Sequence, residues 1–199
     1  MIDKFFLDSV SRIPNRFSEP IGPLLYSLAI CNRPKLIVET GTCWGYLTAW
    51  MAKAASEIGG QVVSIDYYAE ASPHVGSSDR ETVLKNIESC GVLDHVTLLQ
   101  GEAVETLNRL SASGQLDGLG MVMIDDRHEA SQITAECECV LPHLEDWGLI
   151  CGHDVFSPAF MEMGRGYLRF GVDHRLQQVW LTQSEGCIVM QKRPKDIAI

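Results

Sequence analysis

An acid and two glycines stand together where an apolar segment gives way to a helix-like one. The run is Val38-Glu39-Thr40-Gly41-Thr42-Cys43-Trp44-Gly45, between a strand-like segment at residues 35–39 and a helix-like segment at 45–58. Glycines at such a turn let the backbone pass close to a ligand, because they carry no Cβ atom. The Glu39 carboxylate disfavours a diphosphate, whose usual fingerprint has three glycines. The pattern predicts a site for a nucleotide-type cofactor that carries positive charge and hydroxyl groups.

Acids also follow the next three strand-like segments, at Asp66, at Glu102-Ala103 and at Asp125-Asp126. Ligands of open α/β sheets bind beyond the carboxyl ends of the strands, where these residues would meet. An acid after the second strand can accept hydrogen bonds from both hydroxyls of a ribose, and one after the third can reach an adenine amino group. Taken singly, each acid is equally explained as a helix N-cap or a solvated turn residue. Their order behind the glycine turn favours the cofactor site.

Two histidines join these acids near the fourth and fifth strands. Asp125 and His128 follow the fourth strand, and His153 and Asp154 follow the fifth. Such a group of imidazoles and carboxylates can hold a divalent metal or supply a general base near neutral pH. A structural alternative stays open for each histidine, with His128 in the first turn of a helix and His153 bonded to a loop carbonyl.

The segments that position these residues alternate between strand and helix from residue 35 onward, which predicts an α/β fold. We expect a doubly wound, mostly parallel seven-stranded sheet that ends in an antiparallel hairpin. Residues 1–34 are expected to form an N-terminal helical extension or cap, and residues 35–199 the cofactor-binding domain. The expected strands are 35–39, 61–66, 95–100, 119–125, 147–152, 175–181 and 186–192, and the expected helices after residue 35 are 45–58, 78–90, 102–113, 128–143 and 158–170.

Composition limits the partners. The chain has 199 residues, 46% hydrophobic residues and a net charge of -10, which predicts one globular domain that binds neither nucleic acid nor an anionic membrane. Its seven cysteines are scattered without a C-x-x-C pair, which argues against a zinc or redox motif and favours reduced thiols in the cytoplasm. The adjacent apolar residues Phe5, Phe6 and Leu7 are compatible with a homodimer.

The order of these motifs resembles the class I S-adenosylmethionine-dependent methyltransferases, a Rossmann-like fold, and in particular their small-molecule O-methyltransferase-like branch. The resemblance covers about residues 35–192 and is carried by the stretches 38–48 (VETGTCWGYLT), 64–66 (SID), 100–103 (QGEA), 122–129 (VMIDDRHE) and 148–155 (GLICGHDV).

The resemblance implies which residues would surround S-adenosylmethionine. Asp66 would bind its ribose, and Asp125 would lie near the transferred methyl group. Tyr46 could stack on the adenine or shape an acceptor pocket, and it could equally pack on the neighbouring helix. The implied neighbours of the methionine part are Glu39, Gly41, Thr42 and Gly45, and those of the adenine are Glu102 and Ala103.

The resemblance also implies a metal site with one departure from the family pattern. Catechol-methylating relatives hold magnesium with an Asp after the fourth strand and an Asp-Asn pair after the fifth, which would be Asp125, His153 and Asp154 here. An imidazole at His153 in place of a carboxylate favours a softer divalent ion, or no metal.

The implied reaction is methyl transfer to a hydroxyl of a small molecule, with Asp125, His128 and His153 as candidate catalytic residues. Apolar residues after the fifth strand could form the acceptor pocket or ordinary core: Phe156, Phe160, Met161, Met163 and Tyr167. A nicotinamide-dependent oxidoreductase is disfavoured by Glu39 and the missing third glycine. Two alternatives remain: a protein that binds the cofactor without transferring methyl, and a hydroxylase-like relative of the same fold.

Overall fold

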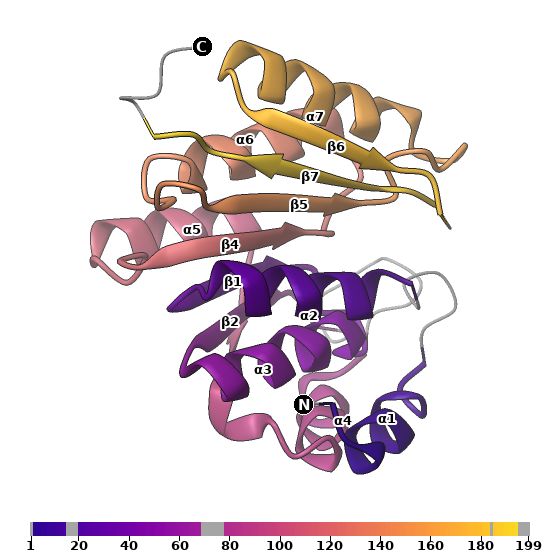
Figure 1. The fold of residues 1–199 in the computed structure, drawn as a ribbon. Helices are drawn as coiled ribbons and strands as arrows, with labels where there is room; N and C mark the ends of the chain where they lie inside the picture. The colour runs from indigo at the N-terminus through magenta and orange to yellow at the C-terminus, as the bar shows by residue number, and fades with distance from the viewer. Residues whose placement is uncertain (1, 15–19, 69–77, 184, 195–199) are drawn as a thin grey trace.

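The computed structural model describes residues 2–14, 20–68, 78–183 and 185–194. The elements follow the expected alternation of strand and helix along the chain (Figure 1). In chain order they are α1 (Lys4–Val10), α2 (Ile21–Asn32), β1 (Leu36–Thr40), α3 (Tyr46–Ile58), β2 (Gln61–Asp66), α4 (Arg80–Ser89), the 3-10 turn η1 (Leu93–His95), β3 (Val96–Gln100), α5 (Ala103–Ala112), β4 (Leu119–Ile124), α6 (Ala130–Val140), β5 (Leu149–His153), α7 (Met161–Asp173), β6 (Gln177–Leu181) and β7 (Cys187–Gln191).

The strands form one seven-stranded sheet in the order β3-β2-β1-β4-β5-β7-β6. The strands from β3 to β5 pair in parallel, whereas β7 is antiparallel to both of its neighbours, β5 and β6. The chain order reverses on either side of β1, so β1 and β4 lie at the switch point where ligands of such sheets bind. The predicted fold class, including the C-terminal hairpin, is confirmed.

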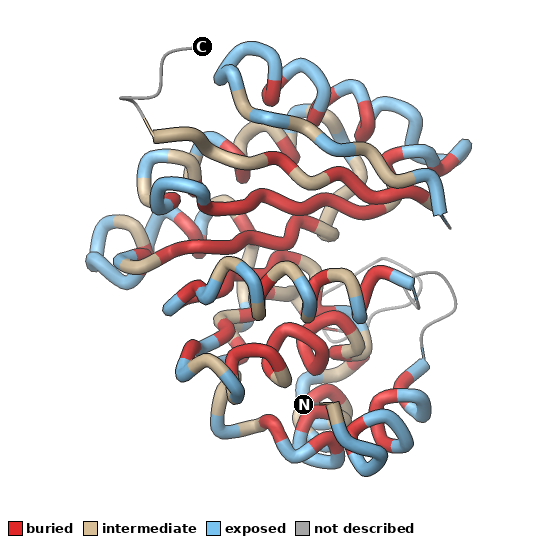
Figure 2. The backbone as a smooth tube through the Cα atoms, viewed as in Figure 1, coloured by how far each residue is buried: buried red, intermediate tan, exposed pale blue. Residues whose placement is uncertain are grey.

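Helices cover both faces of this sheet, and alternate residues of β1 enter different cores. Ile37 packs in the core beneath α1 to α4, while Leu36 and Val38 pack in the core beneath α5 to α7. Successive side chains of a strand point to opposite faces, which explains this division. All five residues of β1 are buried, and Figure 2 shows the central strands as the buried layer of the molecule.

The N-terminal helices share the core of the main domain. Leu25 and Ala29 of α2 are fully buried in the same cluster as Ile37, and α2 packs against α3. On α1, Phe5 is 63% exposed, but Phe6 is 1% exposed and lies against Trp50, so of the three adjacent apolar residues Phe5 and Leu7 are exposed and Phe6 belongs to the core. An amphipathic helix explains this difference, because neighbouring residues point about 100° apart.

Most element bounds agree with the expected ones to within one or two residues, and α6 and α7 differ most. The helix expected over 128–143 spans Ala130–Val140, because Glu129 is extended, and the helix expected over 158–170 spans Met161–Asp173. Residues 69–77 lie outside the described residues, as do 15–19 in the expected N-terminal extension. In the described part of the chain, no helix is both long and apolar enough to span a membrane.

Candidate functional site

Glu39, next to the end of β1, is a fully buried acid with one unpaired oxygen. Its Oε2 accepts hydrogen bonds from the hydroxyls of Thr48 and Ser64, at 2.5 Å each. Its Oε1 is buried and has no hydrogen-bond partner among the described residues. Burial raises the pKa of Glu39 to about 8, against the two hydroxyl bonds that favour the charged form. A cationic ligand would lower this pKa, favour the charged form of Glu39 and give the unpaired oxygen a partner.

The glycine turn after β1 can be built only from glycines at two positions. Gly41 has φ +87°, and a Cβ atom there would lie 2.1 Å from the carbonyl oxygen of Asp125. Gly45 has φ +82° and precedes α3, where a Cβ atom would press on Val83. Thr42 is buried between them, and its hydroxyl lies 2.6 Å from that of Ser64. The turn therefore packs the end of β1 against the end of β4. Because its glycines have no side chains, a ligand at this edge of the sheet would meet main-chain atoms.

Asp66, at the end of β2, holds this turn in place. Its Oδ2 accepts a hydrogen bond from the backbone N–H of Cys43, and its Oδ1 accepts one from Tyr68, both at 2.9 Å. Cys43 and Tyr68 have φ values of 51° and 57°, in the left-handed region. Asp66 thus stabilises two strained residues, and each of its oxygens has a further lone pair for a ribose hydroxyl.

Glu102 is the N-cap of α5, as its structural alternative predicts. Its Oε2 accepts from the backbone N–H of Glu105 at 2.6 Å, and its Oε1 accepts from the side chain of Gln132 at 2.9 Å. Burial alone would raise the pKa of Glu102, but these hydrogen bonds outweigh burial and lower it. The side chain therefore stays charged beside Ala103, which is buried at the start of α5.

A second fully buried acid, Glu136 of α6, was missed because only strand ends were searched. Its Oε2 accepts from the Thr40 hydroxyl at 2.5 Å, and its Oε1 accepts from Gln132 at 3.1 Å. Burial raises the pKa of Glu136 to about 8. Its spacing could have predicted its burial. Glu136 lies three residues after Ile133 and four before Val140, and both of these are buried on the core-facing side of α6.

Asp125, His128, His153 and Asp154 form one acid–imidazole cluster. His128 Nε2 lies 2.9 Å from Asp154 Oδ2 and 3.9 Å from Asp125 Oδ1. His153 Nδ1 lies 3.5 Å from Asp125 Oδ2 and 3.1 Å from Asp154 Oδ1. One ligand atom from each of Asp125, His128 and Asp154 fits within a span of 4.8 Å. This group of three contains His128 where the sequence predicted His153, whose Nδ1 nevertheless lies within 3.5 Å of both carboxylates.

The two histidines of the cluster differ in exposure. The side chain of His153 is 2% exposed and its Nε2 is buried with no hydrogen-bond partner among the described residues, whereas the side chain of His128 is 26% exposed. Burial would lower the pKa of each imidazole, but the neighbouring carboxylates outweigh burial and raise both. Burial raises the pKa of Asp125, although His153 opposes that rise. Of the two histidines, only His128 is placed to meet a molecule from solvent.

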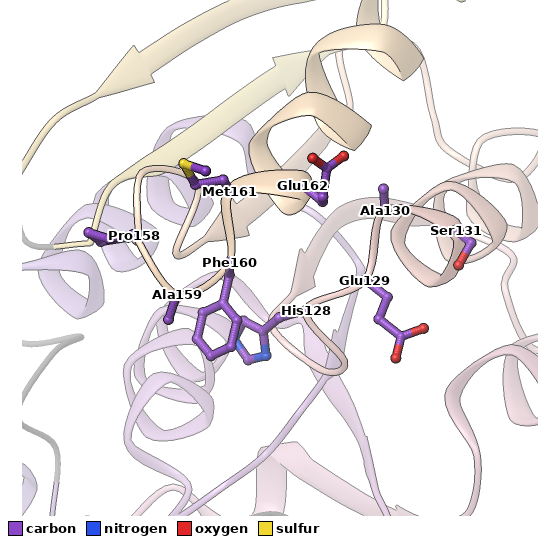
Figure 3. Close-up of a pocket in the computed structure, with 9 residues that line it drawn as sticks. All are labelled: His128, Glu129, Ala130, Ser131, Pro158, Ala159, Phe160, Met161 and Glu162. Carbon is purple, nitrogen blue, oxygen red and sulfur yellow. The ribbon is translucent and has the colours of Figure 1, made fainter.

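A pocket of about 520 Å³ opens beside His128, between the N-terminal ends of α6 and α7 (Figure 3). The His128 ring stacks on Phe160, with ring centroids 4.0 Å apart and planes inclined by 27°. Met161, which is 65% exposed, lines the same pocket with Pro158 and Ala159. The pocket thus combines apolar side chains with an imidazole from the acid–imidazole cluster, and its polar lining residues are Glu129, Ser131 and Glu162.

The other predicted aromatic and apolar candidates lie elsewhere. Phe156 packs on Trp180, and Met163 and Tyr167 are fully buried in the core beneath α5 to α7. The Tyr167 hydroxyl donates a hydrogen bond to the carbonyl of Ile124 at 3.0 Å. Tyr46 contacts Trp50, one turn further along its own helix α3, edge-to-face with centroids 6.4 Å apart.

Comparisons with known proteins agree with this geometry. A family model described as a methyltransferase domain matches residues 38–155. A catechol O-methyltransferase of Mycobacterium tuberculosis is 32% identical over 104 residues, which are 52% of this chain and 41% of that protein. One of Niastella koreensis is 29% identical over 119 residues, which are 60% of this chain and 47% of that protein. The alignments thus span less than half the length of these relatives.

A solved O-methyltransferase from Bacillus cereus in complex with SAH superposes with a TM-score of 0.75 at 20% identity. The match covers 97% of this chain and 92% of that one, so the two share a fold over nearly their whole length.

Proposed function

This chain belongs to the methyltransferase-domain family, and we propose that it transfers a methyl group from S-adenosylmethionine to a hydroxyl of a small molecule. The observation that carries the proposal is the buried Glu39 with an unpaired oxygen beside the glycine turn. The acids Asp66, Glu102 and Asp125 continue the row along the same edge of the sheet. A row of acids with one buried member suits a cationic ligand with hydroxyl and amino groups.

The residues present fit the cofactor part by part. Glu39 and the backbone of the Gly41–Gly45 turn would hold its methionine part, and Asp66 would accept from its ribose hydroxyls. Glu102 and Ala103 would face its adenine. When bound, S-adenosylmethionine supplies a methyl group on a positively charged sulfur, and the acids of this edge favour that charge.

His128 is the candidate general base. It lines the apolar pocket and hydrogen-bonds to Asp154, which holds one orientation of the imidazole. A hydroxyl of an acceptor seated on Phe160 would lose its proton to His128 as the methyl group is transferred. His153 is too buried for this role and would instead act within the acid–imidazole cluster.

The same cluster would hold a divalent metal through Asp125, His153 and Asp154. Two carboxylates and an imidazole nitrogen suit manganese, cobalt or zinc better than magnesium, which prefers oxygen ligands. A cation here would lower the pKa of an acceptor hydroxyl and assist His128.

We further propose a cytoplasmic protein that acts on small molecules and forms a homodimer. All seven cysteines lie in the described part of the chain and none of them forms a disulfide, which suits a reducing compartment. Exposed Phe5 and Leu7 on α1 offer an apolar surface for a second copy. The net charge of -10 argues against nucleic acid as a partner.

Calorimetric titration with S-adenosylmethionine, S-adenosylhomocysteine and NAD, each with manganese, with magnesium and with EDTA, tests the cofactor. Binding of both sulfur compounds and not of NAD supports the proposal, and failure of both overturns it. A methyl-transfer assay with catechol, the acceptor in the relatives' names, and a panel of other hydroxyl compounds then tests the reaction. Binding without transfer to any of them would favour a cofactor-binding protein or a hydroxylase-like relative.

A further inference from the structure

A continuous line of hydrogen bonds links Glu102 to the end of β1. The side-chain amide of Gln132, on the first turn of α6, donates to Glu102 Oε1 at 2.9 Å and to Glu136 Oε1 at 3.1 Å. Glu136 Oε2 is bonded to the Thr40 hydroxyl at 2.5 Å. Thr40 is followed by Gly41 of the glycine turn, so one line joins the predicted adenine side of the site to its methionine side.

The amide of Gln132 is fully used by these two contacts. An amide nitrogen has two hydrogens, and each of them bonds to one of the two acids. Glu136 fixes the Gln132 amide from inside the core, because Glu136 is itself fully buried and held by Thr40.

Glu102 is consequently held at both oxygens, by Glu105 N–H at Oε2 and by Gln132 at Oε1. A carboxylate fixed at two points has its remaining lone pairs in fixed directions. An N-cap requires only the first of these contacts. The second one orients the carboxylate without being needed for the helix.

We propose that Gln132 and Glu136 are positioning residues that orient Glu102 to accept a hydrogen bond from the 6-amino group of the cofactor's adenine. The inference rests on the proposed function. By orienting Glu102, Gln132 and Glu136 make the site prefer adenine to a purine that carries an oxygen at position 6. That oxygen would face the Glu102 carboxylate and be repelled by it.

The neutral state of Glu136 agrees with this arrangement. Burial raises the pKa of Glu136 to about 8, so near pH 7 it is mostly protonated, while Oε1 accepts from Gln132 and Oε2 is paired with the Thr40 hydroxyl. A glutamine at position 136 has the same shape, and its amide oxygen can accept from Gln132 while its amide nitrogen donates to the oxygen of the Thr40 hydroxyl. Glu136→Gln is therefore a matched control for Glu136→Leu, which removes both functions.

The experiment measures the dissociation constants of S-adenosylhomocysteine and S-inosylhomocysteine by calorimetry for five proteins. These are the wild type, Gln132→Met, Glu136→Leu, Glu136→Gln and Glu138→Gln, the last changing an exposed acid on the same helix. Circular dichroism and thermal unfolding establish that each variant is folded.

We expect the wild type to prefer S-adenosylhomocysteine. Gln132→Met and Glu136→Leu should raise the dissociation constant of S-adenosylhomocysteine about tenfold and that of S-inosylhomocysteine by less than about twofold. The preference for S-adenosylhomocysteine over S-inosylhomocysteine therefore falls. Glu136→Gln and Glu138→Gln should retain the wild-type preference.

Equal weakening of both ligands would overturn the inference, because a purely structural role does not depend on the base. A wild type that binds both ligands equally well would overturn it too and leave the proposed function standing. A wild type that binds neither ligand would instead overturn the proposed function itself. If Glu136→Leu does not fold, Gln132→Met decides the question.

Discussion

His128 and Asp154 are joined by a hydrogen bond of 2.9 Å between Nε2 and Oδ2, which connects the loop after β4 to the residue after β5. Asp154 has φ 58°, a left-handed conformation that aspartate tolerates better than most residues. The pair places an oriented imidazole at the wall of the pocket between α6 and α7. This relationship ties the candidate base to the candidate metal ligands.

Replacement of His128 by glutamine should lower kcat by about 10²–10⁴-fold, because it removes the proton acceptor. Binding of S-adenosylhomocysteine should change little, since His128 lies on the acceptor side of the site. Steady-state kinetics and calorimetry measure the two effects separately. His174→Gln, which changes a histidine paired with exposed Glu138, is the control. An unchanged kcat in His128→Gln would exclude His128 as the base.

The metal preference should depend on His153. Calorimetry and the electron paramagnetic resonance of Mn²⁺ should show tighter binding of manganese than of magnesium, because the site offers an imidazole nitrogen. His153→Asp should shift the preference toward magnesium, because it restores an oxygen ligand. Asp154→Asn should weaken the binding of both manganese and magnesium. Manganese binding that is insensitive to these two changes would place the metal elsewhere.

Gly41 and Gly59 provide a matched pair for the glycine turn. Both have positive φ, but a Cβ atom at Gly41 would meet the Asp125 carbonyl at 2.1 Å, whereas one at Gly59 would meet nothing within 4 Å. Gly59→Ala should cost about 1–2 kcal/mol of unfolding free energy from the backbone alone. Gly41→Ala should cost about 1–3 kcal/mol more from the collision. Urea unfolding measures both, and equal losses would contradict the close contact of β1 with β4.

Glu136 should make stability depend on pH. Its pKa is about 8 in the folded chain against 4.5 for the ordinary group, so between these values the unfolded chain releases a proton that the folded chain keeps. Stability from this group therefore falls as pH rises from about 4.5 to about 8.

Glu136→Gln should abolish this pH dependence, because glutamine does not titrate. The free energy of unfolding of the variant should therefore rise relative to that of the wild type as pH increases. We expect the gain at pH 8 over pH 5 to reach at least 1 kcal/mol, or about 2–4 °C in Tm for a chain of this length. Differential scanning calorimetry across this range measures it, with Glu138→Gln as the control. A difference that does not change with pH would mean that Glu136 is ionised in the folded protein.

Phe160 should influence the acceptor and not the cofactor. Phe160→Ala removes the ring that stacks on His128 and forms a wall of the pocket. We expect KM for the acceptor to rise about tenfold, from the loss of an aromatic contact, while binding of S-adenosylhomocysteine stays unchanged. Phe156→Ala, at an aromatic residue that packs on Trp180, is the matched control. Equal effects of the two replacements would mean that the acceptor binds elsewhere.

The sequence by itself determined the order of strands and helices, the glycine turn and the acids at the strand ends. These features are local, because apolar periodicity and glycine placement record which face of each segment is buried. The sequence alone therefore places Glu39, Asp66 and Glu102 at one edge of a sheet.

Only the tertiary structure decided which of these groups touch. Glu136 meets Thr40 across 96 positions of sequence, and His128 meets Asp154 across 26, contacts that arise from the packing of α6 on the sheet and from strand pairing. The same packing placed His128, and not His153, at the pocket, and enclosed Met163 and Tyr167 in the core. No local pattern records such distances, because they depend on how elements far apart in the chain pack together.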